Sequence, residues 1–121
     1  MGISREVALY RMQMKEQGLS QEALAKMVGV SQSAVNQFLT GKSKNKRAYS
    51  EGGALMGDAI ASVLGISFEE VTKLRDADTR EEARNRFAQA QAHMRERAVK
   101  ISGNEPLDEN VRAALRRLLT T

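Results

Sequence analysis

Apolar residues recur along the first third of the chain at spacings of three and four positions, which places them on one face of a helix. Serines that suit a helix N-cap and glycines that suit a helix end divide this stretch into three units. Only Gly29 and Val30 separate the second unit from Ser31, which would cap the third. The pattern therefore predicts three helices in close succession, over residues 4–17, 21–28 and 32–39.

The same spacing continues through the rest of the chain and predicts four more helices. Capping boxes, in which Ser or Thr is followed three residues later by Glu, would open two of them, at Ser67 and Thr79. The alternation of residue types over 98–102 leaves a short strand as an alternative there. A single proline and few β-branched runs favour helices, so we expect an all-α chain. The expected helices cover residues 54–64, 68–75, 79–100 and 108–119.

The predicted third helix has an unusual outer face. Val35 and Phe38 can close an apolar interface with Leu24 on the second helix. The residues left outside are polar and uncharged, where a solvated helix would usually carry Lys and Glu. Amides can pair bidentately with adenine, and hydroxyls can contact bases or phosphates, so the face suits a DNA major groove. The alternative is a merely solvated surface. These residues are Gln32, Ser33, Asn36, Gln37 and Thr40.

Positive charge is concentrated just after this helix. The chain has a formal net charge of +4, and residues 40–50 contain four positive side chains and no acidic one. Acidic and basic residues nearly cancel beyond Phe68. A basic loop beside such a helix favours contacts with DNA phosphates, whereas elsewhere it would be only a solubilising loop. The four residues are Lys42, Lys44, Lys46 and Arg47.

Composition argues against several other classes of protein. The absence of cysteine excludes disulfides, thiol catalysis and cysteine-liganded zinc. His93, the only histidine, is more simply a half-exposed helix residue than a metal ligand or general base. No apolar stretch approaches the roughly 20 residues needed to cross a bilayer, and the N-terminus lacks a continuous apolar signal. We therefore expect a cytoplasmic protein without enzymatic activity, metal, cofactor or membrane association.

The segment LSQEALAKMVGVSQSAVNQFLTGK resembles the helix-turn-helix of the lambda-repressor and Cro family of phage and bacterial regulators. The resemblance covers roughly residues 4–71, including DAIASVLGISFEEV, which is similar to the fourth and fifth helices of that family. It implies a five-helix DNA-binding domain over residues 1–75, followed by a helical carboxy-terminal segment over 76–121. The loop after the third helix is longer and richer in lysine than in the shortest family members. The segment after about residue 76 matches no region of the family.

The resemblance also implies a role for individual residues. The third helix would enter the major groove of double-stranded DNA, with Gln32, Ser33 and Asn36 meeting bases. Gln37 would either meet a base or turn away from the groove. Gln21 would touch a phosphate and brace Gln32. The expected contacts with the DNA backbone come from Gln21, Ser31, Thr40, Lys42, Lys44, Lys46 and Arg47.

Three functions fit these observations, in order of preference. The first is a transcriptional regulator, most simply a repressor, that binds a palindromic operator as a homodimer through residues 79–119 and is open to control by a protein antagonist. The apolar faces of the last two helices would form that interface, unless they fold back onto the amino-terminal domain. The second is an antitoxin whose carboxy-terminal helices hold a toxin encoded beside it. The third is a helical adaptor that binds only protein and shows no salt-dependent DNA affinity.

Overall fold

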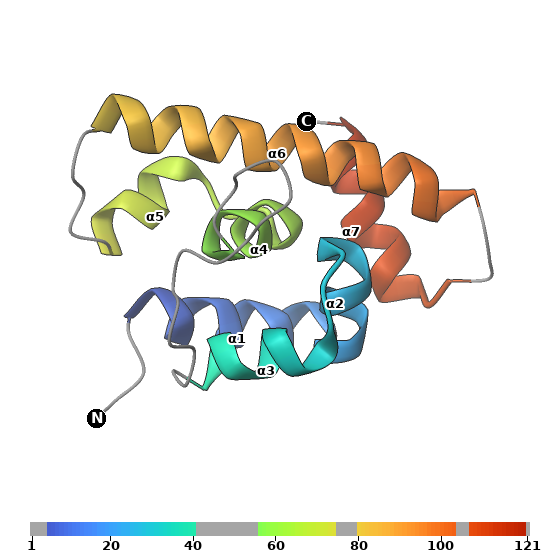
Figure 1. Cartoon of the computed structure of the whole chain (residues 1–121). Coiled ribbons are helices and arrows are strands. Elements are labelled where there is room, and N and C mark those ends of the chain that lie inside the picture. The colour runs from blue at the N-terminus through green and yellow to red at the C-terminus, as the bar shows by residue number, and fades with distance from the viewer. Residues whose placement is uncertain (1–4, 41–55, 75–79, 104–106, 121) are drawn as a thin grey trace.

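The computed structural model describes residues 5–40, 56–74, 80–103 and 107–120 (Figure 1). Within these residues the chain forms α-helices and no strand, which confirms the all-α class. The helices are α1 (Arg5–Gln17), α2 (Gln21–Val28), α3 (Gln32–Leu39), α4 (Met56–Leu64), α5 (Phe68–Leu74), α6 (Arg80–Ser102) and α7 (Glu109–Thr120).

The limits of the helices agree closely with the sequence pattern. α2 and α3 begin and end at the predicted residues. α6 continues without interruption to Ser102, so the alternative of a strand over 98–102 is wrong. α7 starts and ends one residue later than expected. The expected first two residues of the fourth helix, the last residue of the fifth, and Thr79 lie outside the described residues.

Serine caps open both helices of the α2–α3 pair. The Ser20 hydroxyl accepts a hydrogen bond from the Ala23 N–H over 3.0 Å. The Ser31 hydroxyl accepts one in the same way from the Ala34 N–H over 3.1 Å. Each bond satisfies a backbone donor that the start of a helix leaves without an intrahelical partner. The two predicted N-caps are therefore confirmed.

α4 lies at the centre of the molecule, and every one of its residues is buried. α1 packs on one side of it and α6 on the other, with α2 also in contact (Figure 1). A helix that is surrounded in this way needs small or apolar side chains around its circumference, and MGDAIASVL supplies them at every position except the buried Asp58. α3 and α6 consequently lie on opposite sides of the chain, with α4 between them.

The two carboxy-terminal helices fold back onto the amino-terminal ones. The apolar stripe of α6 and the leucine face of α7 are buried in the same core as α1 to α5. The core is therefore continuous across residue 75, where the sequence suggested a division between two segments. Fold-back was the alternative to a dimer interface, and it covers the apolar faces that motivated the dimer. The buried residues of these helices are Ala83, Phe87, Ala90, Met94, Ala98, Val111, Ala114, Leu115 and Leu118.

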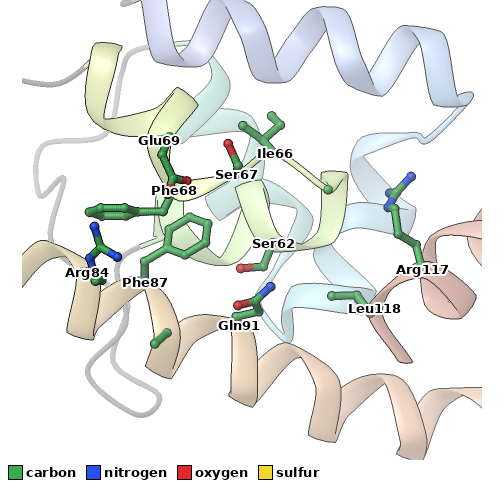
Figure 2. A pocket seen from close by; sticks show the side chains of 12 residues that line it. Ser62, Ile66, Ser67, Phe68, Glu69, Arg84, Phe87, Gln91, Arg117 and Leu118 are labelled. Carbon is green, nitrogen blue, oxygen red and sulfur yellow. The ribbon is translucent and has the colours of Figure 1, made fainter. Parts of the chain in front are cut away.

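A cavity of about 420 Å³ opens between the α4–α5 turn, α6 and α7 (Figure 2). At one side of it Phe68 and Phe87 meet edge to face, with ring centres 5.6 Å apart. The Arg84 guanidinium lies 5.3 Å from the centre of the Phe68 ring. The described lining residues all belong to α4 or to later parts of the chain, so the cavity is separate from the surface of α3.

Candidate nucleic-acid interface

The polar face of α3 points to solvent. Gln32, Ser33, Asn36 and Gln37, the four residues predicted to contact bases, are all exposed. The opposite side of the helix is buried, with Val35 at 0% and Leu39 at 2% exposure. Because the buried side holds the helix against the core, the four polar side chains stand together on a rigid support.

A very short turn fixes how α3 sits against α2. Gly29 ends α2 with a φ of 90°, a left-handed conformation that glycine adopts without a steric penalty. The N–H groups of Gly29 and Val30 both donate to the Ala25 carbonyl, over 2.8 and 3.1 Å. Ala25 is itself buried, and its small side chain allows the two helices to approach closely. The turn therefore has the geometry that the sequence predicts.

Aromatic packing holds the other end of α3. Phe38 is half-buried against the core and stacks on Tyr10 of α1, with ring centres 6.3 Å apart. The Tyr10 side chain is fully buried, and its hydroxyl donates to the Glu6 carboxylate over 2.7 Å. α3 is thus anchored to α2 at its start and to α1 near its end.

A hydrogen bond links the start of α2 to the exposed face of α3. The Asn36 Nδ2 donates to the Gln21 Oε1 over 3.1 Å. The resemblance implied Gln32 as the side chain that Gln21 braces, whereas this bond goes to Asn36. Since Nδ2 carries two hydrogens, Asn36 can keep the bond and still offer one N–H and its Oδ1 to an adenine.

The two hydroxyls predicted to meet the DNA backbone differ in whether their proton is available to a phosphate. The Ser31 Oγ accepts a hydrogen bond in its role as N-cap, so its own proton is available to a phosphate oxygen. The Thr40 hydroxyl instead donates to the Asn36 carbonyl over 2.8 Å. A phosphate would have to compete for that proton. Ser31 is therefore the better placed of the two, and both are exposed.

The four phosphate contacts predicted for the basic loop lie outside the described residues, and they remain predictions from the sequence. They are Lys42, Lys44, Lys46 and Arg47.

Side chains from α6 and α7 complete the ends of three amino-terminal helices, a feature that the sequence did not reveal. Each of these ends has a glycine with positive φ, and a donor side chain lies directly against that glycine. Helix ends leave carbonyl groups without intrahelical partners, so donors from elsewhere stabilise them. The pairs are Gly18 with Asn110, Gly29 with Arg97, and Gly65 with Arg117.

The bonds at two of these ends show how closely the carboxy-terminal helices are held. The Asn110 Nδ2 donates to the Gly18 carbonyl over 3.2 Å. The Arg117 Nη2 donates to the Val63 carbonyl at the end of α4 over 2.7 Å, and to the Gln17 Oε1 over 2.8 Å. Partial burial lowers the pKa of the Arg117 guanidinium by desolvation. An arginine starts so far above neutrality that it stays protonated, and a positive charge suits the negative end of a helix dipole.

Other kinds of site find no support in the described parts of the chain. No group of three His, Cys, Asp or Glu side chains there lies close enough to hold a metal ion. Nor is any described helix long and apolar enough to cross a membrane.

Two short helices joined by a tight turn, with one polar face of the second exposed, define a helix-turn-helix protein. Residues 11–45 match the family model described as helix-turn-helix, and they span α2, α3 and much of α1. The match confirms the resemblance of this segment to the lambda-repressor/Cro-like helix-turn-helix family and supports a DNA-binding transcriptional regulator. Comparisons with curated proteins and with solved structures find no significant match to the chain.

Proposed function

We propose that this chain is a sequence-specific regulator that reads double-stranded DNA through the major groove with α3 and acts as a repressor. One observation supports it above all others. The exposed side of α3 carries amides and hydroxyls without a single charge. Such groups match the donors and acceptors on base edges, whereas a helix face that meets only water usually carries Lys and Glu.

The chemistry of recognition follows from the side chains. Gln32 and Asn36 offer the paired donor and acceptor that adenine requires, and Ser33 adds a hydroxyl that can serve several bases. Ser31 and the backbone N–H groups at the start of α3 face the phosphates, because a helix start carries free donors and partial positive charge. Base contacts specify the sequence in this arrangement, and phosphate contacts set the position of α3 on the duplex.

The direct test selects DNA from a random pool with the wild-type protein and then compares variants on the selected duplex. Gln32→Ala should relax base choice at one position at a cost of about 1–3 kcal/mol. Gln89→Ala is the matched control, since Gln89 is an exposed glutamine of α6, and α6 and α3 lie on opposite sides of α4. If no sequence is enriched, or if Gln89→Ala has the larger effect on base choice, the proposal fails.

Phosphate contacts by the basic loop have a different signature. Lys44→Ala should weaken binding to selected and unrelated DNA about equally, and should reduce the slope of log K against log salt by about one. Gel-shift titrations at several salt concentrations measure both effects. A change in base choice, with the salt slope unaltered, would reassign Lys44 from phosphate to base contact.

The proposed homodimer through residues 79–119 must place both copies of α3 on one side. α6 lies opposite α3, so a two-fold contact through the outward face of α6 would turn the two reading helices away from each other (Figure 1). α7 instead lies beside the helix-turn-helix, and its Asn110 bonds to the end of α1. We therefore assign the contact to the outward side of α7, where Leu119 is 44% exposed.

A measurement of mass in solution tests this assignment with two matched variants. Leu119→Glu should convert the dimer into a monomer, whereas Val99→Glu, at a residue of α6 that is 61% exposed, should leave it intact. If Val99→Glu gave the monomer and Leu119→Glu did not, the dimer contact would lie on α6. The two copies of α3 would then face away from each other and could not bind neighbouring half-sites of one palindrome. A wild-type chain that is monomeric even when bound to its selected DNA would remove the dimer from the proposal.

A further inference from the structure

Arg97 reaches from α6 to the last turn of α2, seventy residues earlier in the chain. Its Nε donates to the Met27 carbonyl over 3.0 Å, and its Nη2 donates to the Lys26 carbonyl over 2.8 Å. These carbonyls belong to the group of four that the end of a helix leaves without intrahelical partners. The Ala25 carbonyl, another of the four, accepts from the Gly29 and Val30 N–H groups. Arg97 therefore supplies donors for two of the four carbonyls at the end of α2.

The guanidinium also lies directly against the turn. A Cβ added to Gly29 would come within 2.6 Å of the Arg97 Cζ and 2.8 Å of its Nε. Glycine therefore suits this position for two reasons: it leaves room for the contact with Arg97, and it tolerates the left-handed φ. The turn and the arginine are therefore fitted to each other. A positive charge at this place also interacts favourably with the negative end of the α2 dipole.

We propose that Arg97 is a positioning residue for DNA recognition, so that α6 helps to orient α3 within the helix-turn-helix. This inference rests on the proposed function of α3. Only Val30 and Ser31 separate Gly29 from the first residue of α3, so the end of α2 sets the direction in which α3 leaves the turn. A helix of eight residues is about 12 Å long.

The length of α3 makes base contacts sensitive to the turn. Phe38 stays stacked on Tyr10 without Arg97, so a shift of the turn swings the start of α3 about this anchored end. By that geometry, a tilt of about 10° moves the first residue of α3, which lies about 9 Å from Phe38 along the helix, by about 1.5 Å. Hydrogen bonds weaken when donor and acceptor separate beyond about 3.2 Å, so such a tilt weakens contacts at Gln32 and Ser33. A variant at this position should therefore fold and bind DNA with a displaced helix.

The first experiment compares Arg97→Ala with Lys100→Ala, which removes the same charge from an exposed lysine of the same helix. The probes are the duplex selected by the wild-type protein and an unrelated duplex, each titrated at several salt concentrations. Arg97→Ala should weaken the selected duplex at least about tenfold, or ~1.4 kcal/mol, more than Lys100→Ala does. The two variants should bind the unrelated duplex alike, and the salt slope of Arg97→Ala should match that of Lys100→Ala.

Two results would overturn the inference. A salt slope that falls by about 0.9 for Arg97→Ala alone would make Arg97 a phosphate contact. If both variants lost the same affinity for both duplexes, Arg97 would contribute to binding only through its net charge. Arg97→Lys serves as a second variant, because it keeps the charge while losing the fork that reaches two carbonyls. It should bind the selected duplex more tightly than Arg97→Ala and less tightly than the wild type.

A measurement without DNA separates this inference from the proposed function. In the free protein, Arg97→Ala should speed amide hydrogen exchange and shift the NMR signals at Gly29 and Val30, while the amides of α4 keep their wild-type exchange rates. Unchanged signals at the turn would refute positioning. If the wild-type protein selects no DNA at all, the proposed function fails, yet the turn signals still decide whether Arg97 holds the turn.

Discussion

Replacing Gly29 with alanine tests the contact between the turn and α6 through stability alone. An alanine at the φ of 90° found here must adopt a left-handed conformation, which costs roughly 1–2 kcal/mol for a residue with a Cβ. The new Cβ would also stand 2.6 Å from the Arg97 Cζ, closer than packed atoms allow. The guanidinium must then move, and its two hydrogen bonds to α2 are lost.

The magnitude follows from adding these terms. Hydrogen bonds at a partly exposed site contribute about 0.5–1 kcal/mol each, so displacement of Arg97 adds roughly 1–2 kcal/mol. Gly29→Ala should therefore lower the free energy of unfolding by about 2–4 kcal/mol, a large share of the 5–15 kcal/mol typical of a small domain. In an Arg97→Ala background only the conformational cost of about 1–2 kcal/mol remains.

Urea unfolding of the four proteins in this double-mutant cycle supplies the assay. The two substitutions should be less costly together than the sum of their separate effects, by about 1–2 kcal/mol. Gly103→Ala is the control, because a Cβ there meets nothing within 4 Å, and it should change stability by less than about 1 kcal/mol. An equal cost of Gly29→Ala in both backgrounds would refute the contact, and a cost below about 0.5 kcal/mol would refute the left-handed turn.

Two further predictions concern the start of α3 and the core. Ser31→Ala should lower the free energy of unfolding by about 1 kcal/mol because it removes the cap on the Ala34 N–H, whereas Ser33→Ala should leave stability within about 0.5 kcal/mol and affect only DNA binding. Thermal or urea unfolding of both variants distinguishes them, and equal costs would contradict the capping assignment. Ile60→Ala, at a fully buried residue of α4, should cost about 2–5 kcal/mol, while Met12→Ala, at 52% exposure, should cost far less. A loss at Ile60 no larger than that at Met12 would contradict the central position of α4.

Local pattern was enough to predict the helices and the exposed face of the reading helix. The limits of α2 and α3 follow from Ser20, Ser31 and Gly29, since caps and a left-handed end depend on neighbouring residues only. Helical spacing also separates buried Val35 from exposed Asn36, because positions on one helix have a fixed angular relation. The sequence therefore identified which residues of α3 are exposed as candidate base contacts, whereas their contact with DNA remains a prediction.

Tertiary structure alone decided what the carboxy-terminal helices cover. An apolar stripe such as that of α6 must be buried, but periodicity carries no information about whether its partner is the same chain or another copy. The same holds for long-range hydrogen bonds. No local pattern around Arg97 indicates that its guanidinium donates to carbonyls at the end of α2. Nor does the sequence indicate that Gln21 bonds to Asn36 rather than to Gln32. Such contacts depend on where the packed core places residues that are far apart along the chain, and that placement has no local signature.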